Sequence, residues 1–384
     1  MFFNVKRFAH ITRRVFARNK RTHIRLTPKR LLVLAVFYTL FPIIEAFTWF
    51  GFWVDDMLYS GYKKVGIAQP VFIIGNPRSG TTFLHDLMAK DTYNFTCPRM
   101  WEILFAPSIA QRKLIWAITR LDSALGAPLH RLLSWWEKEN LSRFTMHRLS
   151  LGSPEEDEYL MIHLGSTVIG GLFFGLPDEA ESFIHFDTDI AAQEQRTVML
   201  FYRLCLQRHL YAHHSRRRIL SKNPFYSAKV KALSREFPGA RFIYLVRSPL
   251  KVIPSYAKLY ASWMEMLADP LEPYPYPEHV LDVTRHWYHY PLEQLEQGPA
   301  DRYRVVKFDA LVGNPRETVR AIYQQFGLEI SPEFDRILIE ETEKSRRYQA
   351  KHSYSLDAMP FKREQIREAY RDVFERWQFD PEES

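Results

Sequence analysis

Short apolar runs separated by amphipathic stretches dominate the chain from residue 71 onward. Four of these runs are rich in β-branched and aromatic residues, and a helix-like pattern follows each of them. The first begins at Val71, and the others cover residues 218–221, 242–246 and 303–308. Strands that alternate with helices form parallel sheets, so the pattern predicts an α/β fold with a parallel sheet flanked by helices.

The helices expected after these strands cover residues 81–90, 226–237, 249–267 and 315–326. The last two open with Pro, which suits the first turn of a helix. Residues 100–215 are mostly helical in pattern, with faces rich in Trp and Leu. We expect this region to form a helical cap beside the sheet.

A hydrophobic stretch at residues 31–53 contains a single charge, Glu45, and is long enough to span a bilayer. Pro42 and Glu45 in its middle equally suit a bent, interfacial or re-entrant helix, and a helix docked on the body is the third alternative. Residues 1–30 contain ten Lys and Arg and no Asp or Glu. The formal charge of the whole chain is +8, so the rest is slightly acidic. We therefore expect this basic arm to meet an anionic membrane surface, and not nucleic acid.

We expect residues 1–66 to form the basic arm and a membrane-associated segment, and residues 67–384 to form one large domain. An interfacial segment keeps both parts on the cytoplasmic face, whereas a single span places the body on the lumenal side. The two cysteines, Cys97 and Cys205, provide no disulfide framework and no metal-binding spacing, which favours a reducing compartment.

The clearest chemical signal is the segment Gly75-Asn-Pro-Arg-Ser-Gly80-Thr-Thr, between the first strand and the first helix. Its glycines have the spacing of a phosphate-binding loop, whose backbone N–H groups and helix N-terminus attract anions. The Lys that usually follows the second Gly serves the β- and γ-phosphates of a nucleoside triphosphate, and Thr81 replaces it here. The loop therefore favours a nucleotide with a single 5′-phosphate chain end, approached by Arg78.

The segment Pro77-Arg-Ser-Gly-Thr-Thr82 resembles the donor loop of sulfotransferases that use 3′-phosphoadenosine 5′-phosphosulfate (PAPS), especially the tyrosylprotein and bacterial branch. The resemblance runs in pieces from about residue 71 to the C-terminus. It implies a P-loop-like fold, transfer of a sulfuryl group to a hydroxyl acceptor, and no metal. It also implies that the 5′-phosphosulfate is held by Arg78, Ser79, Gly80, Thr81 and Thr82.

Two more motifs carry the resemblance. Arg247, at the end of the strand 242–246, and Ser255 eight residues later resemble the family's 3′-phosphate motif. The segment Ser221-Lys-Asn-Pro-Phe-Tyr226 resembles a motif in which Lys222 approaches the transferring sulfuryl group. An ammonium there stabilises the charge that grows on the leaving phosphate. The alternatives are an ordinary salt bridge for Arg247 and a plain surface position for Lys222.

The acceptor hydroxyl needs a base, and the resemblance offers two candidates. Tyrosylprotein enzymes place a catalytic Glu at the position of Arg99, so that match is imperfect. The segment Pro98-Arg-Met-Trp-Glu102 resembles the bacterial pattern, and His147 falls where some members carry a His. We expect Glu102 or His147 to act as base beside Arg78 and Lys222.

A third candidate base is the acidic cluster Glu155, Glu156 and Asp157. This cluster also fits a capping box that opens an amphipathic helix, with Ser153 as N-cap and Glu156 three residues later.

Two other functions are compatible with the sequence. A degenerate P-loop kinase or nucleotide hydrolase would depend on ATP and Mg²⁺, although a convincing Walker B Asp is missing. A membrane-attached nucleotide-binding protein would bind without turnover. For a sulfotransferase, the apolar N-terminal segment leads us to expect a lipid, sterol or other membrane-resident alcohol as acceptor. Nothing in the sequence indicates an oligomeric state.

Overall fold

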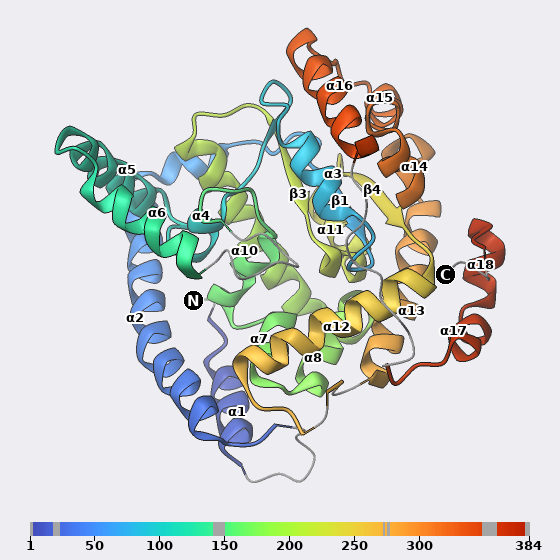
Figure 1. Ribbon diagram of the computed structural model, residues 1–384. Coiled ribbons are helices and arrows are strands. Elements are labelled where there is room, and N and C mark those ends of the chain that lie inside the picture. The colour runs from blue at the N-terminus through green and yellow to red at the C-terminus, as the bar shows by residue number, and fades with distance from the viewer. Residues whose placement is uncertain are drawn as a thin grey trace.

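The computed structural model describes residues 3–17, 24–140, 150–271, 273–274, 277–347 and 359–380. At its centre lies a five-stranded sheet in the order β2-β3-β1-β4-β5, with all pairings parallel (Figure 1). The strands are β1 (Val71–Gly75), β2 (Phe95–Thr96), β3 (Arg218–Lys222), β4 (Arg241–Val246) and β5 (Tyr303–Lys307). The four predicted strands and the α/β fold are confirmed. The short β2 was not predicted.

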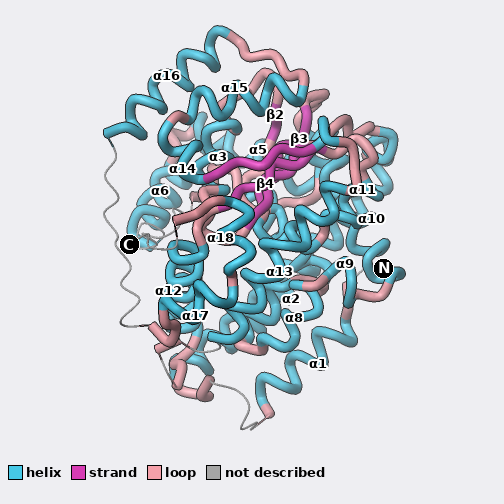
Figure 2. The backbone as a smooth tube through the Cα atoms, turned by 90° about the vertical axis from the view of Figure 1, so that its right-hand side faces the viewer, coloured by secondary structure: helices cyan, strands magenta, loops and turns pink. Residues whose placement is uncertain are grey.

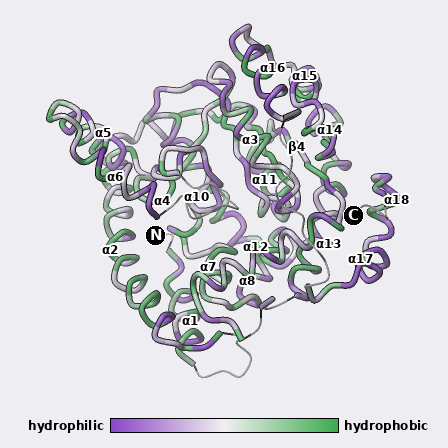
Figure 3. Tube along the Cα trace, in the orientation of Figure 1, coloured by the Kyte–Doolittle hydropathy of each residue, from purple (hydrophilic) through white to green (hydrophobic). Residues whose placement is uncertain are grey.

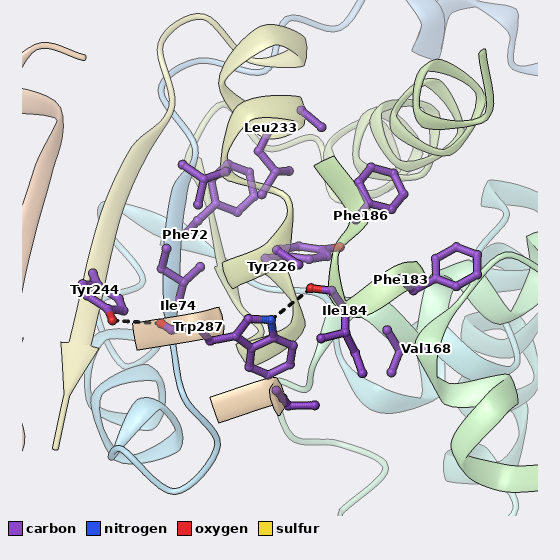
Figure 4. Close-up of a cluster of buried hydrophobic side chains, with 14 of the residues drawn as sticks. Phe72, Ile74, Val168, Phe183, Ile184, Phe186, Tyr226, Leu233, Tyr244 and Trp287 are labelled. Atoms are coloured by element: carbon purple, nitrogen blue, oxygen red, sulfur yellow. Dashed lines mark hydrogen bonds between the residues drawn. The ribbon is translucent and has the colours of Figure 1, made fainter. Parts of the chain in front are cut away.

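The side chains of β1 alternate between two hydrophobic cores, one on each face of the sheet. Phe72 and Ile74 belong to the larger core, which Figure 4 shows in close-up. In this core the Trp287 indole donates a hydrogen bond to the carbonyl oxygen of Ile184 (3.2 Å), and the Tyr244 hydroxyl donates to that of Trp287 (2.9 Å). The Trp287 N–H and the Tyr244 hydroxyl are thereby satisfied inside the core.

Helices cover both faces of the sheet (Figure 2). They include α3 (Thr81–Met88), α11 (Val230–Glu236), α12 (Pro249–Leu267) and α15 (Pro315–Phe326). The predictions for 249–267 and 315–326 are confirmed at both ends, and α3 ends two residues earlier than predicted. The helix predicted over 226–237 is wrong in extent. The Asn223 side chain accepts from the N–H of Phe225 (3.0 Å) and starts a 3₁₀ turn, η3 (Pro224–Ala228), before α11.

The region from 100 to 215 is mostly helical where the structure describes it, as predicted. It contains α4 (Met100–Leu104), α5 (Ile109–Ala124), α6 (Pro128–Asn140), the 3₁₀ helix η2 (Asp157–Leu164), α7 (Val168–Phe174), α8 (Pro177–Ile184), α9 (Phe186–Asp189) and α10 (Ala192–Ala212). The remaining elements are η1 (Ser60–Lys64), α13 (Pro277–Glu296), η4 (Ala300–Arg302), α14 (Phe308–Gly313), α16 (Pro332–Arg347), α17 (Arg363–Ala369) and α18 (Arg371–Trp377).

The N-terminal segment forms α1 (Val5–Phe16) and α2 (Pro28–Leu58), and α2 follows one side of the molecule (Figure 1). By length and composition α2 could cross a membrane. Its inner face nevertheless packs on the body, with polar residues that are paired there. Arg30 donates to the carbonyl oxygen of Leu267 (Nη1···O 2.9 Å), and Glu45 bonds to His163 (2.7 Å). The helix is therefore docked on the body along its length.

Part of the basic arm is also engaged by the body. Arg14 lies 2.7 Å from the Asp178 carboxylate at the start of α8, and Lys29 lies 3.3 Å from Asp269. Acidic residues of the body therefore neutralise some of the arm's charge. That the arm meets an anionic membrane surface stays a prediction. The division of the chain at residue 66 stays a prediction.

Candidate active site

The carboxyl ends of β1, β3 and β4 meet at one edge of the sheet, where open α/β sheets bind ligands. A cavity of about 440 Å³ lies there. One part of its wall is formed by loop and strand-end residues: Pro77, Arg78, Gly80, Thr81, Thr82, Arg247 and Phe308. Another part is apolar and aromatic: Tyr159, Ile169, Leu172, Phe173, Phe225, Leu259, Trp263 and Met264. Such a cavity suits a ligand with an anionic group and an apolar group.

The loop after β1 has a conformation that requires its two glycines. Gly75 has φ +143°, and a Cβ there would lie 2.4 Å from the carbonyl oxygen of Leu245. Gly80 has φ +91°, and a Cβ there would lie 2.8 Å from the ring of Phe308. Arg78 also has a positive φ of 70°, which is uncommon for a residue with a side chain. The glycine spacing in the sequence therefore corresponds to a tight loop held against β4 and α14.

Residues from three separate stretches of the chain come together at this loop. The Arg247 guanidinium donates to the carbonyl oxygen of Arg78 (2.9 Å) and lies over the Phe308 ring, 3.9 Å from its centroid. The Nε of Arg78 donates to Ser255 Oγ (2.9 Å). The residues predicted to bind the 5′-phosphosulfate and those predicted to bind the 3′-phosphate thus form one cationic cluster, and the Phe308 ring packs against it.

The loop also presents donors for an anion. The first N–H groups of α3, at Gly80, Thr81 and Thr82, have no acceptor within the helix, and the helix dipole favours negative charge at this end. Ser79 Oγ is buried and makes no hydrogen bond in the described part of the chain. These residues fit the phosphate and sulfate groups of a nucleotide.

Lys222, the last residue of β3, is buried beside this loop region and paired with Glu156. Its ammonium lies 2.7 Å from Glu156 Oε1 and 3.9 Å from Glu155 Oε1. Burial alone would lower the pKa of Lys222, but the two carboxylates outweigh it and raise that pKa. Lys222 therefore stays charged at neutral pH, and Glu156 reaches the cavity wall.

The predicted capping box over residues 153–156 is wrong. Pro154 forms a β-bridge with Arg99, and the helix that follows is the 3₁₀ helix η2, whose N-cap residue Glu156 makes no side-chain capping bond. The physical reason is the competing partner, because the Glu156 carboxylate is bonded to Lys222.

Asp157 serves a different purpose from its neighbour Glu156. It is fully buried, accepts from Ser221 Oγ (2.9 Å) and from the Tyr202 hydroxyl, and is not part of the cavity wall. Burial raises the pKa of Asp157 to about 7. Asp157 therefore fixes η2 against β3, one residue before Lys222.

Glu102 lies in a buried polar cluster and not in the cavity wall. Its carboxylate bonds to His213 Nε2 (2.5 Å) and lies 3.7 Å from both Arg112 Nε and His209 Nδ1. The carboxylate and imidazole atoms of Glu102, His209 and His213 lie within 4.8 Å of one another, as metal ligands can. Arg112 already supplies a positive charge there, which disfavours a metal ion. The role of Glu102 as base stays a prediction.

His147 lies outside the described residues, so its role also stays a prediction. The sequence patterns did not identify Phe308 as part of the site. They also did not identify the residues of α7 and α12 that form the apolar wall. No motif marks these residues, because apolar positions that line a cavity and apolar positions in a core have the same helical spacing.

The chain resembles known proteins in sequence. The sequence profile described as "Sulfotransferase family" matches residues 70–332. The omega-hydroxy-beta-dihydromenaquinone-9 sulfotransferases Stf3 of Mycobacterium tuberculosis and Mycobacterium bovis are each 27% identical over 314 residues, covering 77% of this chain and 71% of the relative.

Solved structures agree on the fold. Sulfotransferase STF9 from Mycobacterium avium superposes with a TM-score of 0.72 at 16% identity, covering 99% of this chain and 97% of that one. Sulfotransferase STF1 from Mycobacterium tuberculosis gives 0.61 at 19% identity, covering 85% of this chain and 81% of that one. The family match covers more than half of the chain and decides against the kinase alternative. The chain belongs to the sulfotransferase family and is a sulfotransferase enzyme.

Proposed function

We propose that this enzyme transfers a sulfuryl group from PAPS to the hydroxyl of a lipid alcohol. The observation that carries the proposal is the shape of the cavity, which joins the cationic loop around Arg78 and Arg247 to an apolar wall. The Lys222–Glu156 ion pair lies beside it. One ligand site of this kind accommodates a charged donor and an apolar acceptor together.

In this proposal the donor occupies the loop end. The backbone N–H groups at Gly80–Thr82, with Ser79 and Arg78, hold the 5′-phosphosulfate, as anions are held at helix N-termini. Arg247 and Ser255 hold the 3′-phosphate. The hydrogen bonds that join Arg78 to Ser255 and Arg247 to the Arg78 carbonyl support one shared anion site.

The transfer is an in-line displacement at sulfur. The acceptor oxygen forms a bond to sulfur while the bond from sulfur to the bridging oxygen of the 5′-phosphate breaks. The products are a sulfate ester and adenosine 3′,5′-bisphosphate. Lys222 and Arg78 stabilise the charge that develops on the leaving phosphate. We propose that Glu156 takes the hydroxyl proton, in preference to Glu102, because Glu156 lines the cavity.

The apolar wall supports a lipid acceptor. The residues contributed by α7 and α12, such as Leu172, Phe173 and Trp263, offer no charge to a substrate. The Stf3 relatives are named for a hydroxylated menaquinone, a lipid alcohol. A chain alcohol would place its hydroxyl near Glu156 and its apolar part along this wall.

The direct test is transfer of labelled sulfate from PAPS to primary alcohols of increasing chain length. We expect kcat/KM to rise with length, and a Glu156→Gln variant to lose about 10²-fold or more in kcat, the usual worth of a general base. The kcat of a Glu102→Gln variant, expressed per folded molecule, is measured for comparison. Equal rates for short and long alcohols would contradict the lipid acceptor, and a larger loss in Glu102→Gln would return the role of base to Glu102.

A further inference from the structure

Two neighbouring elements expose large apolar side chains to solvent, and the proposed reaction uses neither of them. The first is the outer face of α2, which carries hydrophobic positions along much of its length (Figure 3). Six of its side chains are between 51% and 66% exposed: Leu32, Leu40, Ile43, Phe50, Trp53 and Met57. A soluble protein rarely leaves so large an apolar face uncovered.

The second element is the hairpin of α5 and α6. On α5 the exposed residues Leu114, Ile118 and Leu121 repeat at helical spacing, and the exposed C-cap residue Leu125 continues their stripe. On α6 the exposed residues Leu129, Leu132, Leu133 and Trp136 form a second stripe. None of the 13 residues of α6 is buried, so its apolar side has no cover among the described residues.

Helix α2 and the hairpin are fixed to each other. The Asp55 carboxylate of α2 accepts from the N–H groups of Ile109 (2.8 Å) and Ala110 (2.9 Å), and so caps α5. Gly51 allows this close approach, because a Cβ there would lie 2.4 Å from Ser108 Oγ. Figure 1 shows the hairpin beside the C-terminal half of α2. The two apolar faces therefore belong to one rigid unit.

The chemistry of this unit matches the interface of a lipid bilayer. Trp53 and Trp136 are exposed among the aliphatic side chains, and Trp is the residue that favours the headgroup level of membranes. Lys113, Arg120 and Arg131 are exposed on the hairpin and complement anionic headgroups. A basic, Trp-containing apolar surface is typical of helices that lie in the interface.

A membrane-spanning arrangement of α2 conflicts with its inner face. Arg30, Glu45 and Asp55 are buried there and paired with groups of the body. Removing the helix from the body would leave buried charges without partners on both sides, which is costly.

We propose that the outer face of α2 and the α5–α6 hairpin together form one membrane-docking surface. It lies in the headgroup region of a single leaflet that contains anionic lipid, and α2 does not cross the bilayer. The first turn of α2 adjoins the apolar cavity wall, since Arg30 donates to the carbonyl oxygen of Phe173 (Nη2···O 3.2 Å). Docking therefore brings the apolar part of the cavity close to the lipid.

The test is flotation of the full-length protein with vesicles of phosphatidylcholine and phosphatidylglycerol. We expect Leu121→Glu/Leu132→Glu to reduce the vesicle-bound fraction tenfold or more. The matched control is Tyr93→Glu/Ile339→Glu, which places the same charges at exposed apolar positions elsewhere and should bind like wild type. Arg120→Gln/Arg131→Gln should weaken binding to these vesicles more than to vesicles of phosphatidylcholine alone.

Three results would overturn the proposal. Equal flotation of the hairpin variant and wild type would remove the hairpin from the docking surface. The second is that the wild type binds no vesicles and is a dimer in light scattering, while the hairpin variant is a monomer. That result would show that a second copy of the chain covers this face. If the N-terminus and the body lay on opposite sides of a membrane, α2 would have to cross the bilayer. Calorimetry of nucleotide binding to the same variants reports on the donor site separately.

Discussion

Among single residues, Lys222 has the most specific proposed role. It is buried beside the donor loop and paired with Glu156, which lines the cavity. Lys222→Ala should lower kcat by about 10²–10³-fold, because a fixed positive charge near the leaving group is lost. Donor affinity should change much less, since the loop and Arg247 remain. Steady-state kinetics together with calorimetry separate the two effects.

A matched control for Lys222 exists in the same fold. Lys229 is equally buried and lies 2.9 Å from Glu158, but neither residue lines the cavity. Both alanine variants should lose roughly 3–5 kcal/mol of stability, the usual cost of breaking a buried pair. Only Lys222→Ala should lose turnover per folded molecule. Equal turnover in the two variants would show that Lys222 has only a structural role.

Glu102 should govern stability in acid. Burial opposes its ionisation, but Arg112, His213 and His209 outweigh burial and hold the pKa of Glu102 well below its usual value of 4.5. A depressed pKa gives stability that is present above about pH 4.5 and is lost as the pH falls. Glu102→Gln should therefore be less stable than wild type at pH 7, and the difference should shrink below pH 4.5.

Urea denaturation between pH 3 and pH 7 measures this difference. The exposed Glu340, changed to Gln, is the control and should follow wild type at every pH. A constant gap between wild type and Glu102→Gln across this range would show that the cluster does not depend on the charge of Glu102.

At the scale of elements, local sequence signals predicted the helix ends correctly where no distant residue competes for the capping side chain. Pro at the first turn and a clear apolar pattern placed α12 and α15 correctly at both ends. The capping box at Ser153 failed because Glu156 has a stronger, distant partner in Lys222. Strand β2 has two residues, too few to show a period of two.

The contact between α2 and α5 depends on Gly51. In Gly51→Ala the new Cβ would lie 2.4 Å from the Oγ of Ser108, the N-cap of α5. Overpacking of this kind costs about 1–3 kcal/mol, although Ala also gains up to about 1 kcal/mol in helix propensity. We expect a net loss of stability in thermal unfolding. Gly66→Ala is the control, since no atom lies within 4 Å of its Cβ, and a loss as large there would contradict this explanation.

At the scale of the whole molecule, the sequence identified the charged half of the site better than the apolar half. The loop, Arg247 and Lys222 follow strand ends, and parallel strands bring their ends to one edge. The apolar wall comes from α7 and α12, whose residues lie about 90 positions apart, between 169–173 and 259–264. Their convergence depends on tertiary packing, which no local pattern contains. The same holds for the polar inner face of α2, whose partners Leu267, His163 and Arg208 are distant in sequence.

The most direct measurement is titration calorimetry with adenosine 3′,5′-bisphosphate, adenosine 5′-monophosphate and ATP. It uses wild type, Arg247→Ala and the control Arg241→Ala, whose side chain bonds to the Phe326 carbonyl outside the cavity wall. If the cavity holds PAPS, wild type and Arg241→Ala bind the bisphosphate at least tenfold more tightly than the monophosphate, and Arg247→Ala loses this difference. Preference for ATP, or equal affinity for all three nucleotides, would contradict the proposed donor site.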